Sequence, residues 1–326
     1  MSISKMDLKF FKPILLVFVL LVISCKNDKK SESNTAREVV EIKVDSVMEL
    51  GMVDILTTAM EFQMPDTLPA GWLHLRYKNA SAEPHFFILE KYPEGVGIEE
   101  AKKEIVPVFQ DAMDSIMVDR FEAGMKRFDS LPAWYQEVVF HGGSGLISPG
   151  KVSNSYVNLQ PGTYLIECYV KMPNGKFHSS MGMLKQFEVV DKWSSMSQPK
   201  ATVDLTVSSD QGITFDGDVS SGDHVFSVFF KDAKIYGNFV NHDVHLVKLE
   251  DEDAVDNLNS WMNWLEKDGF ISPGPQGVVF LGGSQEMPMG STTFFRATLT
   301  PGLYGLIAEV PDSKAKGLFK TFTVSE

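Results

Sequence analysis

Cysteine and basic residues are both scarce in this chain of 326 residues. It has only two cysteines, Cys25 and Cys168, so any sulfur chemistry depends on these two positions. Lysine and arginine number 30 against 43 aspartates and glutamates, which gives a formal net charge of −13. Because such a negative field repels polyanions, we expect neither nucleic acid nor an acidic membrane surface as a partner.

The usual sequence motifs of catalysis are also missing. The chain has no H-E-x-x-H zinc motif and no Walker motif, and residues 142–146 (GGSGL) lack the final glycine of a nucleophile elbow. A binding or carrier protein is therefore a better expectation than an enzyme.

A run long enough to span a membrane is missing as well, since the apolar stretch at residues 14–23 is too short to cross a bilayer as a helix. Lysines precede this stretch, and it ends in V-I-S-C at Cys25. This arrangement resembles a bacterial lipoprotein signal with its lipobox, which implies that residues 1–24 are removed and that Cys25 carries lipid. An ordinary cleaved secretory signal is the alternative. Residue Lys26 does not resemble an inner-membrane retention signal, so we expect a lipid-anchored protein of the cell envelope, in the outer membrane of a Gram-negative bacterium. Residues 26–37 (KNDKKSESNTAR) are polar and low in apolar residues, so we expect a flexible tether over residues 25–45.

The chain contains an internal repeat at an offset of 140 residues. Residues 138–144 (VVFHGGS) align with 278–284 (VVFLGGS), and residues 161–164 (PGTY) align with 301–304 (PGLY). Upstream, at a shifted offset, residues 85–90 align with 245–250. We interpret the chain as two copies of one domain, with domain 1 at residues 46–191, a linker at 192–200 and domain 2 at 201–326.

Most segments of each copy have the pattern of short strands. Apolar and polar residues alternate along residues 71–78, and residues 157–170 read as a strand, a Pro-Gly turn and a second strand. Each copy also has a segment with helical features, from Ile98 to about Arg127 in the first and from Asp253 to Lys267 in the second. The sequence therefore predicts an all-β protein of two β-sandwiches, each with a helical insertion.

The surroundings of Cys168 are unusual for an exported thiol. A solitary exported cysteine is exposed to oxidation, which leaves an inert buried thiol, an intermolecular disulfide or a metal ligand as explanations. His178 lies on the loop after Cys168, Met183 lies where the next strand should begin, and His85 opens an earlier strand. A thiolate, two imidazoles and a thioether form the ligand set of a blue copper site, and we expect these groups to meet at one end of the first sandwich.

The segments 79–86 (NASAEPHF), 161–168 and 178–189 resemble the cupredoxin family, the blue copper proteins, over most of residues 46–190. The resemblance implies tandem Greek-key cupredoxin-like sandwiches with one copper ion in domain 1. His85, Cys168 and His178 would be the equatorial ligands and Met183 the axial ligand, with Met181 or Met172 as alternatives for the axial position. Nine residues separate Cys168 from His178, more than in familiar members, and residues 173–175 (PNG) are a suitable turn for folding this loop back.

The second copy lacks the proposed ligands. Ala308 aligns with Cys168 and Leu318 aligns with Met183, so only His245 keeps a counterpart. The chain also has no His-x-His pair, which the trinuclear cluster of a multicopper oxidase would need. We therefore expect one-electron transfer to and from a redox partner protein. A copper carrier or sensor without redox cycling and a metal-free scaffold for protein interaction are the alternatives.

Overall fold

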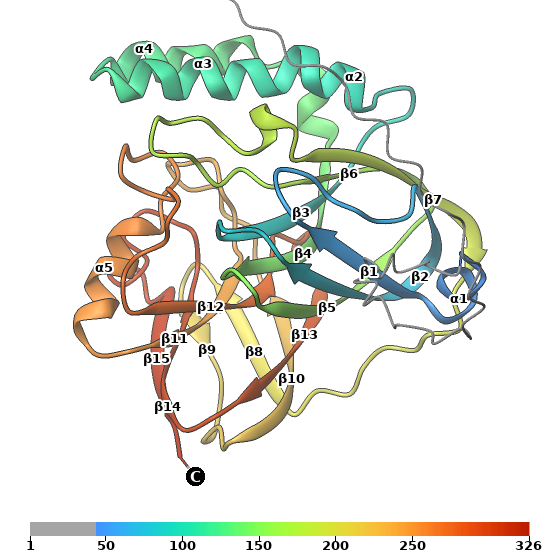
Figure 1. Cartoon of the computed structure of the whole chain (residues 1–326), viewed down its shortest axis with the longest axis vertical. Helices are drawn as coiled ribbons and strands as arrows, with labels where there is room; N and C mark the ends of the chain where they lie inside the picture. Colours follow the sequence, from blue (N-terminus) through green and yellow to red (C-terminus); the bar gives the residue numbers. More distant parts are fainter. Residues whose placement is uncertain (1–43, 326) are drawn as a thin grey trace, which may run out of the picture. The chain divides into compact units, whose positions relative to one another are not determined.

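Strands dominate residues 44–325, the part of the chain that the computed structural model describes (Figure 1). The first half contains β1 (Met52–Thr57), β2 (Thr67–Asn79), β3 (His85–Lys91), β4 (Val139–Ile147), β5 (Val152–Leu159), β6 (Gly162–Glu167) and β7 (Leu184–Trp193). The second half contains β8 (Val203–Ser208), β9 (Gly212–Thr214), β10 (Gly222–Phe230), β11 (Val244–Leu249), β12 (Val278–Ser284), β13 (Thr292–Leu299), β14 (Gly302–Ile307) and β15 (Phe319–Val324). The all-β prediction is confirmed.

Alternation along the strands buries one face of each sheet. In β2 the side chains of Leu73, Leu75 and Tyr77 are buried, while Arg76 between them is exposed. Because successive side chains of a strand point to opposite faces, the pattern read from the sequence orients β2 with its apolar face on the core.

The strands of the first half form two layers that share β2. One layer contains β1, β2 and β5, and the other runs in the order β4-β3-β6-β7. The long β2 pairs with β5 over most of its length, and at its start, from Thr67 to Ala70, it pairs in parallel with β7. This arrangement is a β-sandwich closed along one side.

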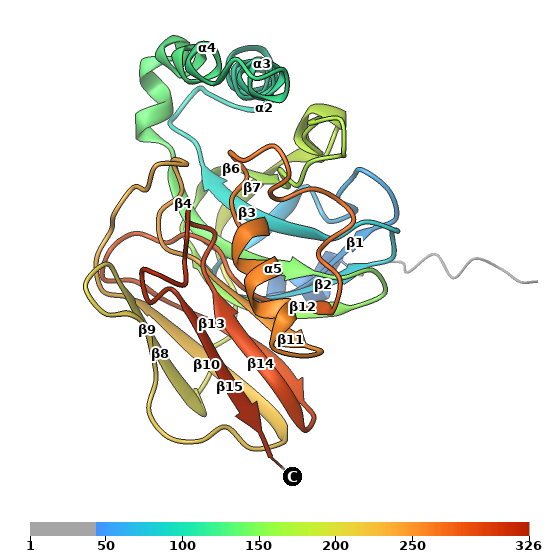
Figure 2. The same cartoon turned by 90° about the vertical axis from the view of Figure 1, so that its left-hand side faces the viewer.

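The second half pairs its strands in the same order. β8 and β10 correspond to β1 and β2, and the order β12-β11-β14-β15 corresponds to β4-β3-β6-β7. The two halves are joined by two further pairings, β5 with β13 and β4 with β12, so that one strand path runs through both (Figures 1 and 2). The segment between Trp193 and Val203 contains no strand and includes residues 194–200 of the predicted linker, whose first two residues belong to the end of β7.

The repeated Gly-Gly-Ser motif has a steric explanation. Gly143 has a φ of 141°, and a Cβ atom at this position would lie 2.1 Å from the carbonyl oxygen of Phe87 in β3. Gly283 has a φ of 133°, and a Cβ atom there would lie 2.0 Å from the carbonyl oxygen of Val244 in β11. Only glycine permits these backbone contacts, at corresponding places in the two halves.

The first helical insertion is more broken than predicted and extends further along the chain, whereas the second is shorter than predicted. The first consists of α2 (Ile98–Glu100), a π-helical turn η1 (Ala101–Ile105), α3 (Val106–Met117), α4 (Phe121–Met125) and the 3₁₀ turns η2 (Lys126–Ser130) and η3 (Ala133–Glu137). Asp119 has a φ of 61°, a left-handed conformation that ends α3, so that α4 packs beside α3 instead of continuing it (Figure 2).

The remaining helices are short. α1 is Val44–Leu50, η4 is Ser179–Met181, and the second insertion keeps a single helix, α5 (Asp253–Trp261). No helix in the described part of the chain is long and apolar enough to cross a membrane.

Candidate metal centre

Three side chains predicted as metal ligands come from separate places in the first sandwich. His85 is the first residue of β3, Cys168 directly follows the last residue of β6, and His178 directly precedes η4. The strands β3 and β6 are antiparallel neighbours, and Ile88 lies opposite Glu167. The end of β6 therefore places Cys168 beside the beginning of β3.

The loop between Cys168 and His178 folds back on itself. The amide of His178 donates to the carbonyl of Val170 at 2.9 Å, and the amide of Met172 donates to the carbonyl of Lys176 at 2.8 Å. Gly175, in the predicted turn, has a φ of 81°. These backbone bonds return His178 to the side of Cys168 despite the length of the loop.

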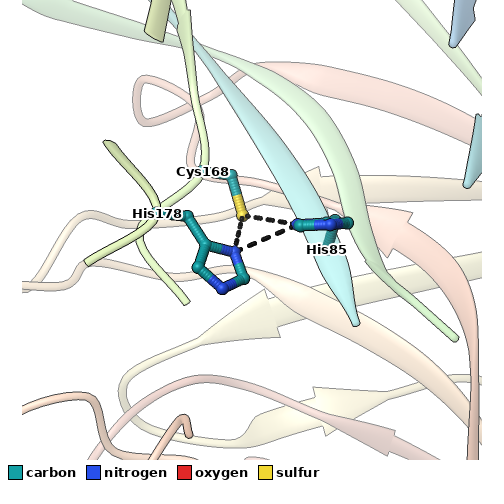
Figure 3. Close-up of side chains that lie close together, drawn as sticks. All are labelled: His85, Cys168 and His178. Carbon is teal, nitrogen blue, oxygen red and sulfur yellow. Dashed lines mark hydrogen bonds between the residues drawn. The ribbon is translucent and has the colours of Figure 1, made fainter. Parts of the chain in front are cut away.

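The three side chains face one another (Figure 3). The sulfur of Cys168 lies 3.7 Å from Nδ1 of His85 and 3.7 Å from Nδ1 of His178. The two Nδ1 atoms are 3.1 Å apart. Two donors that bind one first-row ion at about 2.0–2.3 Å lie roughly 3–4 Å from each other, so the triangle has the dimensions of a shared coordination sphere.

This triangle is sealed from solvent and incompletely hydrogen-bonded. Cys168, His85 and His178 are each fully buried. Their rings leave Nε2 of His85 and Nε2 of His178 buried without a hydrogen-bond partner. Buried polar atoms nearly always have a hydrogen-bond partner. A purely structural cluster that leaves the two buried Nε2 atoms without a partner is therefore costly. A metal ion bound by the inward atoms fits this donor set, because thiolate and imidazole are the ligands that copper prefers.

Burial keeps all three groups uncharged in the absence of an ion. Desolvation raises the pKa of the Cys168 thiol to about 12, although backbone amides of Phe86 and Val170 favour the thiolate. Desolvation lowers the pKa of His85 to about 3, with the neighbouring His178 as a smaller cause. It lowers the pKa of His178 to about 4. Both imidazoles are therefore free to donate a lone pair at neutral pH, whereas the thiol must lose its proton to bind a cation.

Met183 is fully buried and belongs to the same loop system. The amide of Cys168 donates to the carbonyl of Met183 at 3.2 Å, and the amide of Met183 donates to the carbonyl of His178 at 2.9 Å. Met181 is exposed, with 42% of its surface accessible, which disfavours it as a ligand of a buried ion. The axial role of Met183 stays a prediction, and Cys25, the predicted lipidation site, lies outside the described residues.

The second half contains a cluster that looks similar but is bonded differently. Asp243, His245 and Glu309 are buried, and they offer ligand atoms within 4.8 Å of one another. The amide of Leu146 donates to Nδ1 of His245 at 2.9 Å, so the ring proton is on Nε2, which lies 2.7 Å from Asp243 Oδ2. An ion at Nε2 would have to displace that proton from a ring whose other nitrogen already accepts a hydrogen bond. We therefore assign this cluster to hydrogen bonding, which agrees with the expectation that the second copy lacks the copper site.

Residues of the second half hold the loop that carries the first-half ligands. The amide of Lys171 donates to the carbonyl of Phe270 at 2.8 Å, and the buried Lys171 Nζ donates to the carbonyl of Trp264 at 2.8 Å and to that of Glu266 at 2.5 Å. The hydroxyl of Tyr169 donates to Glu309 Oε2 at 3.0 Å. Sequence reasoning missed these contacts, which fix the residues directly after Cys168.

Two of the five histidines outside the triangle, His242 and His245, lie close together in the sequence but do not converge on a common site. Nε2 of His242 lies 2.8 Å from Asp232 Oδ1, whereas His245 is bound to Asp243. The structure thus gives the two rings separate partners.

Comparison with protein-family models finds no match, and comparison with curated proteins finds none either. Among solved structures, an auracyanin from Roseiflexus castenholzii is 19% identical with a TM-score of 0.26, over 44% of this chain and 98% of that chain. Auracyanin A, a "blue" copper protein from Chloroflexus aurantiacus, is 22% identical with a TM-score of 0.24, over 43% of this chain and 97% of its own. The blue copper oxidase from Nitrosomonas europaea is 13% identical with a TM-score of 0.19, over 84% of each chain. Likenesses of this size assign the chain to no family.

Proposed function

We propose that the protein binds one copper ion through His85, Cys168 and His178 and transfers single electrons. The observation that carries this proposal is the triangle of three buried, inward-facing donor atoms with sides of 3.1 to 3.7 Å. Thiolate stabilises the cuprous ion, imidazole binds both oxidation states, and a distant thioether, the role we propose for Met183, tunes the potential. The ligand set matches the cupredoxin resemblance of the sequence.

The surroundings of the triangle suit electron transfer better than exchange of the metal. Cys168 and the two histidines are fully buried, and the loop between Cys168 and His178 is bound to both halves. A site whose ligands cannot move far changes oxidation state with little rearrangement. The tandem arrangement then has a purpose, because the second half stabilises the ligand loop of the first.

We further propose that the protein works outside the cytoplasm, tethered by lipid on Cys25 to the outer membrane of a Gram-negative cell. The lipobox-like sequence V-I-S-C and the polar tether after it support this location. An anchored electron carrier requires a redox partner protein at the same membrane.

Titration of the purified protein with cupric ion tests the function. We expect an intense visible absorption band from thiolate-to-copper charge transfer at a stoichiometry of one. Cys168→Ser should abolish the band, and His141→Gln, a histidine outside the triangle, should keep it.

Three results of this titration lead to different conclusions. A band that appears in wild type and bleaches reversibly with reductant supports electron transfer. Binding of cuprous ion without any cupric band would favour the carrier or sensor. A colourless protein whose thiol stays accessible to alkylation after unfolding, in the presence of copper, contradicts the copper site altogether.

A further inference from the structure

A second potential binding site lies beside the triangle, in a cavity of about 70 Å³. Its polar lining includes Glu90, Glu167, Glu286 and Asn238, and its apolar lining includes Phe109 and Trp264. The cavity is bounded by α3, by the ends of β3 and β6, and by loops of the second half. This volume is well above the roughly 10–15 Å³ that one water molecule needs.

The charged groups that line this cavity are all acidic. Glu90 and Glu286 are at least nine-tenths buried, and no lysine or arginine lines the cavity. Burial of several carboxyl groups without a cation is expensive. Without a cation these carboxyl groups avoid that cost by keeping their protons, and a cation inside the cavity would favour their charged form.

An independent observation comes from Asn238. This residue is fully buried, and its Nδ2 donates to the carbonyl of Glu309 at 2.9 Å. Its Oδ1, in contrast, is buried without a hydrogen-bond partner. Since a buried amide oxygen is rarely left unpaired, the cavity offers an open place for a hydrogen-bond donor.

Aromatic rings also line the cavity. The ring centroids of Phe109 and Tyr135 are 6.2 Å apart, those of Phe109 and Trp264 are 5.8 Å apart, and those of Phe177 and Trp264 are 5.7 Å apart. The faces of such rings attract cations, most strongly when the site is shielded from water.

The shape of the acidic group disfavours a bare metal ion. Within residues 44–325, the groups of at least three donors that gather within 4.8 Å are the His85–Cys168–His178 triangle and the Asp243–His245–Glu309 cluster, and the cavity glutamates form no third group. Their oxygens are spread around a larger volume, next to rings that cannot coordinate a hard cation.

We propose that this cavity binds a small primary ammonium ion, with its N–H groups on the carboxyl groups and Asn238 Oδ1 and its carbon atoms against Phe109 and Trp264. An alkylammonium ion supplies the missing charge, several donors and an apolar part at once. The proposal does not depend on the copper site, although two lining residues, Glu167 and Ser179, are chain neighbours of Cys168 and His178.

The pKa values of two glutamates in the cavity agree with a cation site that holds no cation. Desolvation, followed by the charge of Asp243, raises the pKa of Glu286 to about 8. Desolvation, followed by the charge of Glu167, raises the pKa of Glu90 well above its ordinary value. A bound ammonium ion would favour the charged form of both carboxyl groups.

Isothermal titration of the copper-free full chain with ethylammonium chloride tests the proposal. Ethanol serves as a neutral analogue of similar size, and calcium chloride serves as an inorganic cation. We expect saturable binding of ethylammonium alone. Glu286→Gln and, separately, Glu90→Gln should each weaken it about tenfold or more, because each removes one buried charge partner. Glu122→Gln, at an exposed position on α4, is the matched control and should bind as wild type does.

Four outcomes would overturn the inference. They are no saturable heat with ethylammonium at millimolar concentration, equal affinity in both cavity variants and wild type, binding of ethanol as tight as that of ethylammonium, and displacement of ethylammonium by equimolar calcium. Thermal unfolding of each variant identifies a misfolded protein, and the second glutamate variant keeps the test decisive if the first does not fold. Copper binding by all variants should be unchanged, which separates this site from the proposed electron-transfer function.

Discussion

The substitution Glu286→Gln should stabilise the protein by an amount that grows with pH. The folded protein holds the proton of Glu286 up to a pKa of about 8, whereas the unfolded chain releases it near the ordinary value of 4.5. Between these values the unfolded state binds fewer protons than the folded state, so wild-type stability falls as pH rises. Glutamine has nearly the same shape but no titrating proton, so the variant does not lose stability in this way as the pH rises.

The size of the effect follows from the shift. Each unit of pKa difference corresponds to about 1.4 kcal/mol, so the free energy of unfolding of the variant should exceed that of wild type by about 1.4 kcal/mol more for every pH unit. The difference should begin near pH 4.5, where the free carboxyl titrates, and become constant above pH 8, where the buried one does. Its plateau is about 4–5 kcal/mol as an order of magnitude.

Urea unfolding of both proteins at several pH values measures this difference directly. Groups far from Glu286 cancel in the comparison, since they are present in both proteins, whereas Glu90 and Glu309, whose pKa values the charge of Glu286 raises, add to the same difference. Glu122→Gln, on the exposed face of α4, should show no trend with pH. A difference that stays constant from acid to alkaline pH would refute the reasoning, because it would mean that Glu286 titrates alike in the folded and unfolded states.

Three further predictions concern the ligand loop and the sheet. The apparent affinity for cupric ion, measured by chelator competition, should rise about tenfold per pH unit across the neutral range, since burial raises the pKa of Cys168 to about 12 and binding must release its proton; a pH-independent affinity would contradict thiolate ligation. Lys171→Met leaves the buried carbonyl of Trp264 and the partly buried carbonyl of Glu266 without their donor, and it should lower the free energy of unfolding by about 2–4 kcal/mol and speed the loss of copper. Unaltered copper release would show that the ligand loop does not need these two hydrogen bonds. Gly143→Ala forces a Cβ atom against the carbonyl of Phe87 and should cost about 3 kcal/mol or more in chemical denaturation, so a variant as stable as wild type would contradict the close approach of β3 and β4.

The sequence was sufficient for the fold class and for the members of the triangle. Alternation in β2 and the Pro-Gly turns before Tyr164 and Tyr304 are local signals, and local signals survive into the structure because burial on one face of a sheet enforces them. His85, Cys168 and His178 could be grouped because the ends of adjacent strands meet at one edge of a sandwich.

Other features depend on contacts between distant segments and could not be read in the same way. The first helical insertion was expected to be continuous, but the left-handed Asp119 turns the chain back, and no pattern of apolar residues encodes that turn. The lining of the acidic cavity is assembled from segments as far apart as Glu90 and Glu286, each of which looks like an ordinary polar residue in the sequence. The hydrogen bonds from Lys171 Nζ to the carbonyls of Trp264 and Glu266 could not be predicted either, since backbone carbonyls have no sequence signature.

The pairings of β5 with β13 and of β4 with β12 join the two copies into one hydrogen-bonded unit. A chain broken within the strand-free segment between Trp193 and Val203 would still be held together by these hydrogen bonds and by the aromatic contacts around Phe270. Either copy produced alone would instead present bare strand edges to solvent and invite aggregation. The second copy lacks the proposed copper ligands, but the first copy still needs it, because the strand edges of the first copy would otherwise be exposed to solvent.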